Sequence, residues 1–240
     1  MKRKIEDFRK LCTKFETIMR NGKYHLLGPN DSVWYEFSHD REFRQYRDSI
    51  QTIRVIRNSI SHYNYDWKNS PADEEGITIS DIAFDKLEEI INYVNNPPTV
   101  ESIYKKRAEL FTAKKDDSVK NVIEEMRKRG ITHVPILDSK GKLSGVFSEN
   151  TIFSKLCDEE ILGIDENETL DTYEKYLPIE SHESEYFSFV SRHEKLFNVV
   201  EMFNNYIKGD KKLVLIFVTE DGKESQSILG IISPWDVIKV

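Results

Sequence analysis

Residues 130–152 read GITHVPILDSKGKLSGVFSENTI, and residues 212–238 read KLVLIFVTEDGKESQSILGIISPWDVI. Each stretch contains an apolar run, a turn with Gly-Lys, a second apolar run that includes a glycine, and then a serine. Short apolar runs bounded by turn residues are typical of buried strands, and serine is a favoured residue at the start of a helix. We therefore predict a strand–turn–strand–helix unit in both stretches.

The two stretches belong to an internal repeat. Residues 121–124 (NVIE) correspond to residues 198–201 (NVVE), and residues 143–148 (LSGVFS) correspond to residues 228–233 (ILGIIS). The offset between the copies grows from 77 to 85 residues, which we assign to longer loops in the second copy. A repeated supersecondary unit needs its twin to bury its sheet face, so we expect the copies to fold together.

The first copy has two more predicted elements upstream of residue 130. Residues 110–112 (LFT) are predicted to form a short strand. Residues 118–129 are predicted to form a helix that ends at Gly130, because glycine readily adopts the left-handed conformation after a helix end. Each copy therefore has the order strand, helix, strand, strand, helix.

The domain boundary is predicted at Asn95-Asn96-Pro97-Pro98, because adjacent prolines end a helix and favour an extended linker. This gives a helical domain over residues 1–97 and a second domain over residues 98–240. Within the second domain, we place the first copy at about residues 100–160 and the second at about residues 173–240.

Three helices are predicted before the boundary, at about residues 5–21, 39–63 and from Ser80 to 95. The aromatic-rich residues 22–38 stay unassigned. The apolar positions at helical spacing are Ile5, Phe8, Leu11, Phe15 and Ile18 in the first helix, Ile50, Ile53, Ile56 and Ile60 in the second, and Phe84, Leu87, Ile91 and Val94 in the third. The predicted fold class is α+β multidomain, with a helical bundle followed by two βαββα repeats.

Residues 100–240 resemble a pair of CBS repeats. The resemblance rests on the Gly-apolar-apolar-Ser-x-x-Asp element, on the turn before it and on the repeat itself. In that family the two repeats pack about a pseudo-twofold axis and leave two clefts, which commonly hold AMP, ADP, ATP or a related adenosine ligand. The resemblance thus implies an adenine nucleotide as a regulatory ligand.

The resemblance also implies the residues that contact the nucleotide. A strand-to-helix turn directs N–H groups and a hydroxyl toward phosphate, and a carboxylate one turn later accepts the ribose hydroxyls. These positions are Gly230, Ser233 and Asp236 in the second copy, and Gly145, Ser148 and Thr151 in the first. Because the first copy lacks the carboxylate, we expect one dominant site. Further implied contacts are Thr112, His133, Val134, Phe189 and Val190.

Other interpretations of these residues stay open. Asp236 is also placed to cap the last helix, and a histidine on a strand, such as His133, is commonly a packed core residue. Some CBS pairs bind no nucleotide and serve as dimerisation surfaces.

Residues 56–63 (IRNSISHY) resemble the HEPN superfamily, whose mark is an arginine, a polar residue and then a histidine near a helix end. In active members two protomers bring these motifs together and cut RNA without a metal. The resemblance implies that Arg57 stabilises the developing phosphorane charge and that His62 transfers the proton of the ribose 2′-hydroxyl. Asn58 would orient the histidine or hold a phosphate. Helical geometry places Arg57 beside the isoleucine stripe, where we expect a partner from a subunit interface.

The competing interpretation is a solvated helix face. His62 is then only a cation near a helix C-terminus, and Arg41, Arg44, Arg47 and Arg54 are surface charges rather than a track for an RNA backbone. The protein would in that case be a non-enzymatic adaptor whose helical domain serves dimerisation or partner docking.

Composition limits the remaining classes. The net charge is −7, of which residues 1–97 carry about −1, so neither domain is a bulk polyanion binder. No apolar run approaches the roughly 20 residues of a membrane span. Cys12 and Cys157 form no disulfide framework and are expected to be buried thiols, and the six histidines lack metal-ligand spacing. We expect a cytoplasmic homodimer with an adenine nucleotide as ligand, RNA as candidate partner, and no metal.

Overall fold

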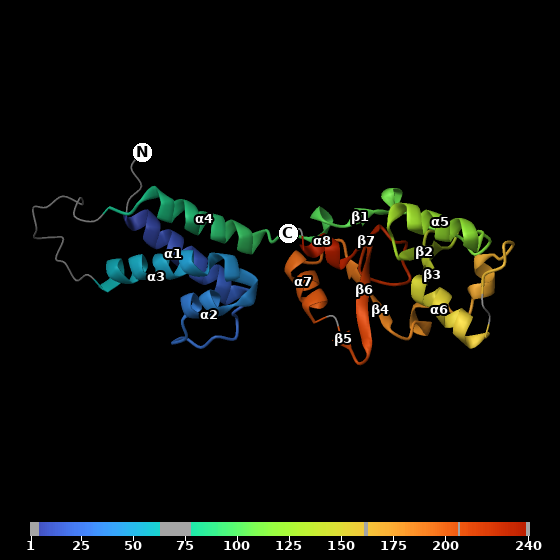
Figure 1. Ribbon diagram of the computed structural model, residues 1–240. Coiled ribbons are helices and arrows are strands. Elements are labelled where there is room, and N and C mark those ends of the chain that lie inside the picture. Colours follow the sequence, from blue (N-terminus) through green and yellow to red (C-terminus); the bar gives the residue numbers. More distant parts are fainter. Residues whose placement is uncertain (1–4, 63–77, 161–162, 206, 239–240) are drawn as a thin grey trace, which may run out of the picture. The chain divides into compact units, whose positions relative to one another are not determined.

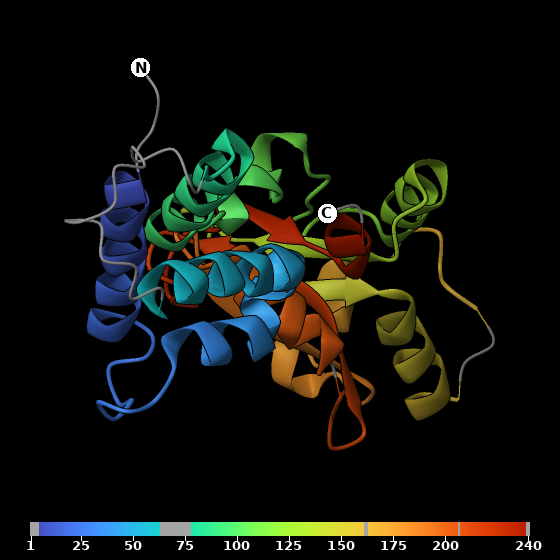
Figure 2. The ribbon, with the colours of Figure 1, turned by 90° about the vertical axis from the view of Figure 1, so that its left-hand side faces the viewer.

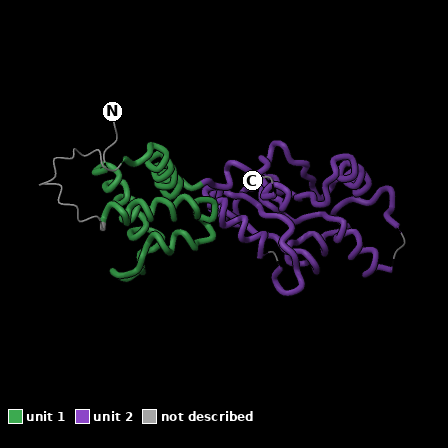
Figure 3. The backbone as a smooth tube through the Cα atoms, turned by 60° about the vertical axis from the view of Figure 1, so that its left-hand side comes forward, with its two compact units in different colours: residues 1–97 green, residues 98–240 purple. Residues whose placement is uncertain are grey.

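The computed structural model describes residues 5–62, 78–160, 163–205 and 207–238, apart from the side chain of His62. The chain divides into two compact units, Met1–Pro97 and Pro98–Val240 (Figure 3). The first unit is helical and the second is mixed α/β (Figure 1). The predicted α+β class is therefore confirmed.

The first unit encloses one apolar core (Figures 1 and 2). Phe15 is fully buried in this core, with its ring 4.7 Å from that of Trp34 and 5.1 Å from that of Phe37. The helices are α1 (Ile5–Asn21), α2 (Val33–His39), a 3-10 helix (Arg41–Tyr46), α3 (Arg47–His62) and α4 (Asp81–Asn95). The predicted first and third helices are present, and α4 begins after Ser80 as expected.

The predicted helix over residues 39–63 is divided in the structure. Phe43 has non-helical backbone angles (φ −108°, ψ 19°), and the α-helix begins only at Arg47. The Phe43 ring stacks on Phe37 at 4.2 Å and is 3% exposed, so burial of this ring accompanies the kink. Residue Tyr63 lies outside the described residues. The unassigned residues 22–38 contain most of α2, whose N-cap Ser32 accepts a hydrogen bond from the Tyr35 N–H.

The second unit contains both copies of the repeat. The first copy supplies α5 (Val119–Arg129), β2 (His133–Leu137), β3 (Leu143–Ser148) and α6 (Glu149–Asp158). The second copy supplies β4 (Glu185–Ser191), α7 (Leu196–Asn204), β5 (Ile207–Lys208), β6 (Lys211–Thr219), β7 (Gly230–Ile232) and α8 (Pro234–Ile238). Strand β1 (Lys105–Lys106) and four short 3-10 helices, Val100–Ser102, Arg107–Glu109, Leu170–Tyr173 and Ile179–Ser181, complete the described elements.

Two sheets organise this unit. Strands β2 and β3 form an antiparallel hairpin. The other sheet has the order β1-β7-β6-β4, with β4 parallel to β6 and β5 extending as a hairpin from β6 (Figure 1). A cluster that includes Val146 of β3 and Phe217 of β6 joins the two copies, while α5 and α7 each pack against the strands of their own copy.

The segment that leads into each copy lies on the other copy. Val100 donates its N–H to the Glu194 carbonyl at 2.9 Å, just before α7. In the same way, Thr169 pairs with Ser118, which precedes α5. Thr99 pairs with Lys195, which precedes α7, just as Thr169 pairs with Ser118. Thr99 and Thr169 are therefore equivalent positions in the two copies. The second copy accordingly begins a few residues earlier than the predicted residue 173.

The glycine of the repeated element is required by this exchange of segments. A Cβ on Gly145 would lie 2.5 Å from the Leu177 carbonyl oxygen, and a Cβ on Gly230 would lie 2.2 Å from the Lys105 carbonyl oxygen. Both contacts are too short for any side chain, so each glycine admits the lead-in backbone of the other copy. In the structure Gly230 accommodates the backbone of β1, and its assignment to a nucleotide site stays a prediction.

The predicted strand at residues 110–112 is wrong. The chain pairs with β7 through Lys105–Lys106 and turns as a 3-10 helix. It then forms an isolated parallel bridge to β2 between Ala113 and Ile136. The Arg107 N–H donates to the Leu229 carbonyl at 2.7 Å. The lead-in segment is therefore held by the second copy, which leaves too short a stretch for a regular strand in the first.

Candidate nucleotide sites and the helical motif

The first-copy turn lies where β3 passes into α6. The Ser148 Oγ accepts a hydrogen bond from the Thr151 N–H at 3.3 Å, and the Thr151 Oγ1 accepts one from the Ser148 N–H. Ser148 is 1% exposed and Thr151 is 2% exposed. The two residues therefore cap the helix reciprocally and are buried, although the resemblance assigned them to phosphate and ribose.

A carboxylate from the second copy occupies the start of α6. Glu185, the first residue of β4, accepts a hydrogen bond from Ser148 Oγ at 3.2 Å and one from Asn150 Nδ2 at 2.6 Å. Its side chain is 9% exposed. Because the N-terminus of a helix attracts anions, Glu185 takes the position that the resemblance gives to a phosphate.

Two histidines complete this buried cluster. His133 Nε2 lies 3.0 Å from Glu185 Oε1, and His182 Nδ1 lies 3.1 Å from Glu185 Oε2. An ionised carboxylate only accepts hydrogen bonds, so both rings donate. The edge of the Phe187 ring packs against both imidazoles. His133 therefore lies in the Glu185 cluster. The resemblance had instead implied that it lines an adenine pocket.

The surroundings of Glu185 hold it in the charged form. Burial raises the pKa of this carboxyl, but the hydrogen bonds from His133, His182 and Asn150 outweigh the burial, and the pKa lies well below its ordinary range. The start of α6 consequently carries a negative charge at neutral pH that the chain itself supplies.

The second-copy turn, between β7 and α8, has a different arrangement. The Ser233 N–H and Oγ–H donate to Asp236 Oδ2 at 2.8 and 2.6 Å. Both residues are half-buried. Among the described residues, no donor reaches the other carboxylate oxygen, Oδ1. Asp236 thus caps the last helix, as one interpretation expected, and presents a second oxygen for another partner.

The two turns differ most in the residue that corresponds to Glu185. The offset of 77 residues that relates Ser118 to Lys195 assigns this position to Ala108 in the other copy. Ala108 is exposed and has no acceptor side chain. Glu185, Asn150 and His182 are not among the residues predicted from the sequence. Comparing the copies position by position would have singled out Glu185, because an acid replaces an alanine there.

The other implied nucleotide contacts do not meet in one place. Val134 is fully buried against α5, whereas Val190 is 6% exposed and packs in the core beside α7. The Phe189 ring stacks on Phe217 at 5.3 Å between the copies. Thr112 is half-exposed in the irregular segment before Ala113. Val134 and Val190 therefore line separate cores.

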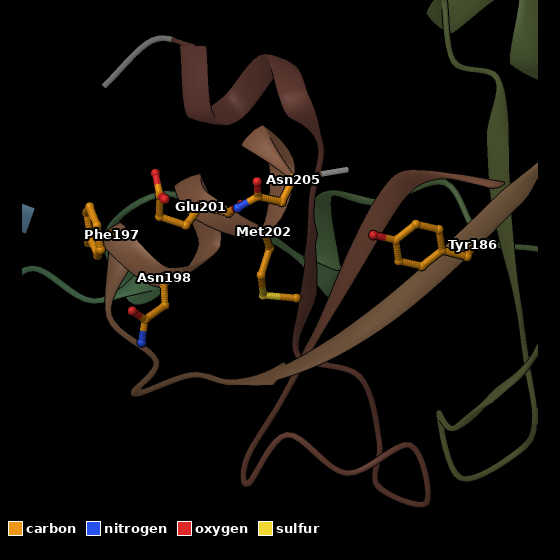
Figure 4. Close-up of a pocket in the computed structure, with 6 residues that line it drawn as sticks. All are labelled: Tyr186, Phe197, Asn198, Glu201, Met202 and Asn205. Atoms are coloured by element: carbon orange, nitrogen blue, oxygen red, sulfur yellow. The ribbon is translucent and has the colours of Figure 1, made fainter. Parts of the chain in front are cut away.

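A cavity of about 400 Å³ lies beside α7 (Figure 4). Tyr186 of β4 lies on one side, and the other lining residues come from α7 and its C-terminal end: Phe197, Asn198, Glu201, Met202 and Asn205. It includes none of the implied nucleotide contacts, and its one charged side chain is a carboxylate, which repels phosphate. This cavity is not the predicted nucleotide site.

The HEPN-like motif lies on α3 of the helical unit. Arg57 Nη2 lies 3.2 Å from Glu16 Oε1, and Arg57 Nη1 donates to Asn58 Oδ1 at 3.1 Å. Glu16, on α1, also accepts a hydrogen bond from the Trp34 indole N–H. The partner expected from a subunit interface is thus supplied by the same unit. Helix α3 ends at His62, whose side chain lies outside the described residues.

The described residues show neither a metal cluster nor a membrane span. No three histidine, cysteine or acidic side chains in them are placed to hold a metal ion. No helix among them has both the length and the apolar composition needed to cross a bilayer.

Solved structures resemble part of the chain. CBSX2 in complex with AMP is 16% identical, with 59% of this chain and 93% of that chain covered and a TM-score of 0.40. The CBS domain pair of MJ0100, in complex with 5′-methylthioadenosine and S-adenosyl-L-methionine, is 19% identical, with 59% and 94% covered and a TM-score of 0.40. The CBS domains of a transcriptional regulator from Streptococcus pneumoniae are 18% identical, with 60% and 100% covered and the same TM-score of 0.40.

A search of curated proteins gives no match to this sequence. A family model does match: the model described as CBS domain covers residues 100–158. This segment is the first copy of the internal repeat, from the 3-10 helix at Val100 to the end of α6 at Asp158. The first copy is therefore matched as a CBS domain in its own right, and the second copy is related to it by the repeat.

Proposed function

We propose that residues 98–240 form a regulatory module that binds one adenine nucleotide per chain, at the second-copy turn of Ser233 and Asp236. The observation that carries this proposal is the difference between the turns. Glu185 fills the start of α6, whereas the half-buried Asp236 retains a carboxylate oxygen without a donor among the described residues. The family match of the first copy and the internal repeat support a nucleotide as the ligand.

Binding at this turn would exchange one set of hydrogen bonds for another. Without a ligand, the donors of Ser233 are satisfied by Asp236. With a nucleotide, Asp236 would accept the ribose hydroxyls, and the Ser233 N–H and hydroxyl would turn to phosphate. The donors of Ser233 keep an acceptor in both states, and Asp236 Oδ1 gains a donor when the nucleotide binds, so the exchange carries little desolvation cost.

Titration calorimetry of the full chain with AMP, ADP and ATP tests the proposal. We expect one dominant site for at least one of these ligands. Asp236→Ala should raise the Kd by about 10-fold or more, the order of magnitude for loss of one charge-assisted hydrogen-bond pair. The matched control is Glu149→Ala, which removes an exposed carboxylate from the corresponding first turn of α6. Two equal sites, or full binding by Asp236→Ala, would contradict the proposal.

The second candidate function belongs to the helical unit. We propose that this unit binds RNA and, as a dimer, cleaves it without a metal. The supporting observation is that the Arg57 guanidinium and the Asn58 amide lie in direct contact on α3, with the Arg57 side chain 37% exposed. Arg57 would have to share its charge between Glu16 and a phosphate, while His62 would take the proton of the ribose 2′-hydroxyl.

A cleavage assay separates this candidate from a non-enzymatic adaptor. RNA incubated with purified protein and a chelator should be cut, leaving a cyclic phosphate on the 5′ fragment, and Arg57→Ala and His62→Ala should each abolish the cut. Glu36→Ala, which removes a half-exposed acidic side chain on α2, serves as the control. Intact RNA together with no detectable RNA binding would leave the adaptor as the function.

A further inference from the structure

The helical unit contains a cavity whose lining lies mostly outside the HEPN-like motif. It has a volume of about 340 Å³ and lies between α2 and α3. Tyr35 and His39 line it from α2, and Gln51, Arg54 and Asn58 line it from α3. This volume is at the lower end of the range for ligand pockets, so the cavity suits one compact group. Asn58 also belongs to the HEPN-like motif, which places the cavity beside the proposed RNA site.

One wall of the cavity is an aromatic platform. The Tyr35 side chain is prominent at the surface, with the residue 49% exposed. Its ring lies 4.1 Å from the His39 ring at an interplanar angle of 31°. His39 is held in turn through its Nδ1, which is 2.8 Å from the Tyr35 carbonyl oxygen. The two rings are therefore fixed relative to each other and leave exposed aromatic surface, on which a nucleobase can stack.

The opposite wall carries a cation without a counterion. Arg54 is half-buried and makes no ion pair or hydrogen bond with any residue that the structure describes. Gln51 is likewise without a hydrogen-bond partner within the described ranges. No carboxylate lines the cavity. A half-buried guanidinium gains from an anion, and phosphate suits its planar fork.

We propose that this cavity binds one nucleotide of a single-stranded RNA. The base stacks on Tyr35, the amides of Gln51 and Asn58 face the edge of the base, and Arg54 binds the adjacent phosphate. The proposal rests on the proposed RNA binding of the helical unit and adds to it a specific subsite. It identifies Tyr35 and Arg54, rather than the motif residues, as the determinants of affinity.

Fluorescence anisotropy with 5′-fluorescein-labelled 12-nucleotide homopolymers of A, C and U tests the proposal in the full chain. All proteins carry His62→Ala, so that the RNA stays intact. We expect Tyr35→Ala to weaken binding by about 5- to 150-fold, the range for loss of one stacked base. Tyr35→Phe should bind like the parent because it keeps the ring, and Tyr35→Leu should stay weak because it keeps only the bulk.

Salt dependence gives a readout that a merely structural role would not change. Arg54→Ala should lower the slope of log K against log salt by about 0.7, the value for one lost phosphate contact on a single strand. Tyr35→Ala should leave the slope unchanged. Lys14→Ala removes one positive charge from α1, on a different groove of the unit, and should retain the parent slope. A parent slope in Arg54→Ala, or parent affinity in Tyr35→Leu, would overturn the proposal.

The failure of this proposal is distinguishable from failure of the proposed function. If the parent binds no RNA, the RNA function and its subsite both fall. If the parent binds RNA and the Tyr35 and Arg54 variants bind equally well, only the subsite falls. A last arm titrates AMP into the Asp236→Ala chain. Binding that depends on Tyr35 there, with no dependence for RNA, would assign the cavity to a free mononucleotide and overturn RNA as its source.

Discussion

The two strand-to-helix turns of the repeat have the same glycine and serine but different surroundings. At the first turn, Ser148 and Asn150 donate to Glu185, which the other copy inserts at the start of α6. At the second turn, Ser233 donates only to Asp236, three residues along its own helix. The comparison shows that equivalent turns acquire different roles when their partners differ, because Glu185 reaches the first turn from the other copy, whereas Asp236 takes the position of Thr151 at the second. The first three predictions that follow alter the first turn and leave its counterpart unchanged, and the fourth compares two thiols.

The largest effect is expected from Glu185→Ala. This change leaves four donors around the buried carboxylate position without that acceptor, and it removes one of the contacts between the copies. We expect the free energy of unfolding to fall by about 3 kcal/mol, as for removal of one partner of a buried charged pair. Urea denaturation followed by circular dichroism measures it. Glu183→Ala, an exposed acid two residues earlier, should change stability by less than about 0.5 kcal/mol. Equal effects would show that the cluster is not stabilising.

The pH dependence of stability provides a second contrast. The folded pKa of Glu185 is lowered, so its contribution is fully present above the ordinary glutamate pKa of about 4.3 and is lost as pH falls toward the folded value. The advantage of the parent over Glu185→Gln should therefore shrink between about pH 5 and about pH 2. Denaturation midpoints across this range measure the difference. A gap between the two proteins that stays constant with pH would contradict the assignment.

A smaller effect is expected from replacing the missing carboxylate with a free anion. In Glu185→Ala the start of α6 retains Ser148, Asn150 and both histidines, so inorganic phosphate should bind there. At a phosphate concentration five times its Kd, the stabilisation would be about 1 kcal/mol. Thermal unfolding with phosphate against chloride at equal ionic strength measures it. The parent should show no such gain at this site, and an equal shift in both proteins would indicate a general salt effect.

The smallest expected change concerns the two thiols, which the sequence analysis expected to be buried. Cys12 is buried on α1, and burial together with the nearby Glu16 charge raises its pKa to about 12. Cys157, at the end of α6, is exposed, so that expectation is wrong for it. Ellman's reagent should modify one thiol per native chain and two after unfolding. Cys157→Ser should remove the native reaction. Reaction of both thiols in the native chain would contradict the burial of Cys12.

The spacing of apolar residues and the positions of turn glycines were sufficient to predict much of the fold. The repeated apolar runs and turn glycines predicted β2, β3 and α6, and Gly130 ended α5 in the left-handed conformation as expected. The apolar stripe of the second helix was also correct, because Ile50, Ile53 and Ile60 are buried. These features depend on residues close together in the chain, where backbone geometry and side-chain spacing decide the outcome.

The sequence by itself thus determined the two units, the repeat and the residues of each strand-to-helix turn. Only the tertiary structure decided which of these residues stay available to a ligand. The exchange of lead-in segments brings Lys105 onto Gly230 and Leu177 onto Gly145, and it places Glu185 at the start of α6. Arg57 of α3 likewise pairs with Glu16 of α1. Such contacts join residues tens of positions apart, and a motif read along one segment does not contain the partner that satisfies its charge or its hydrogen bonds.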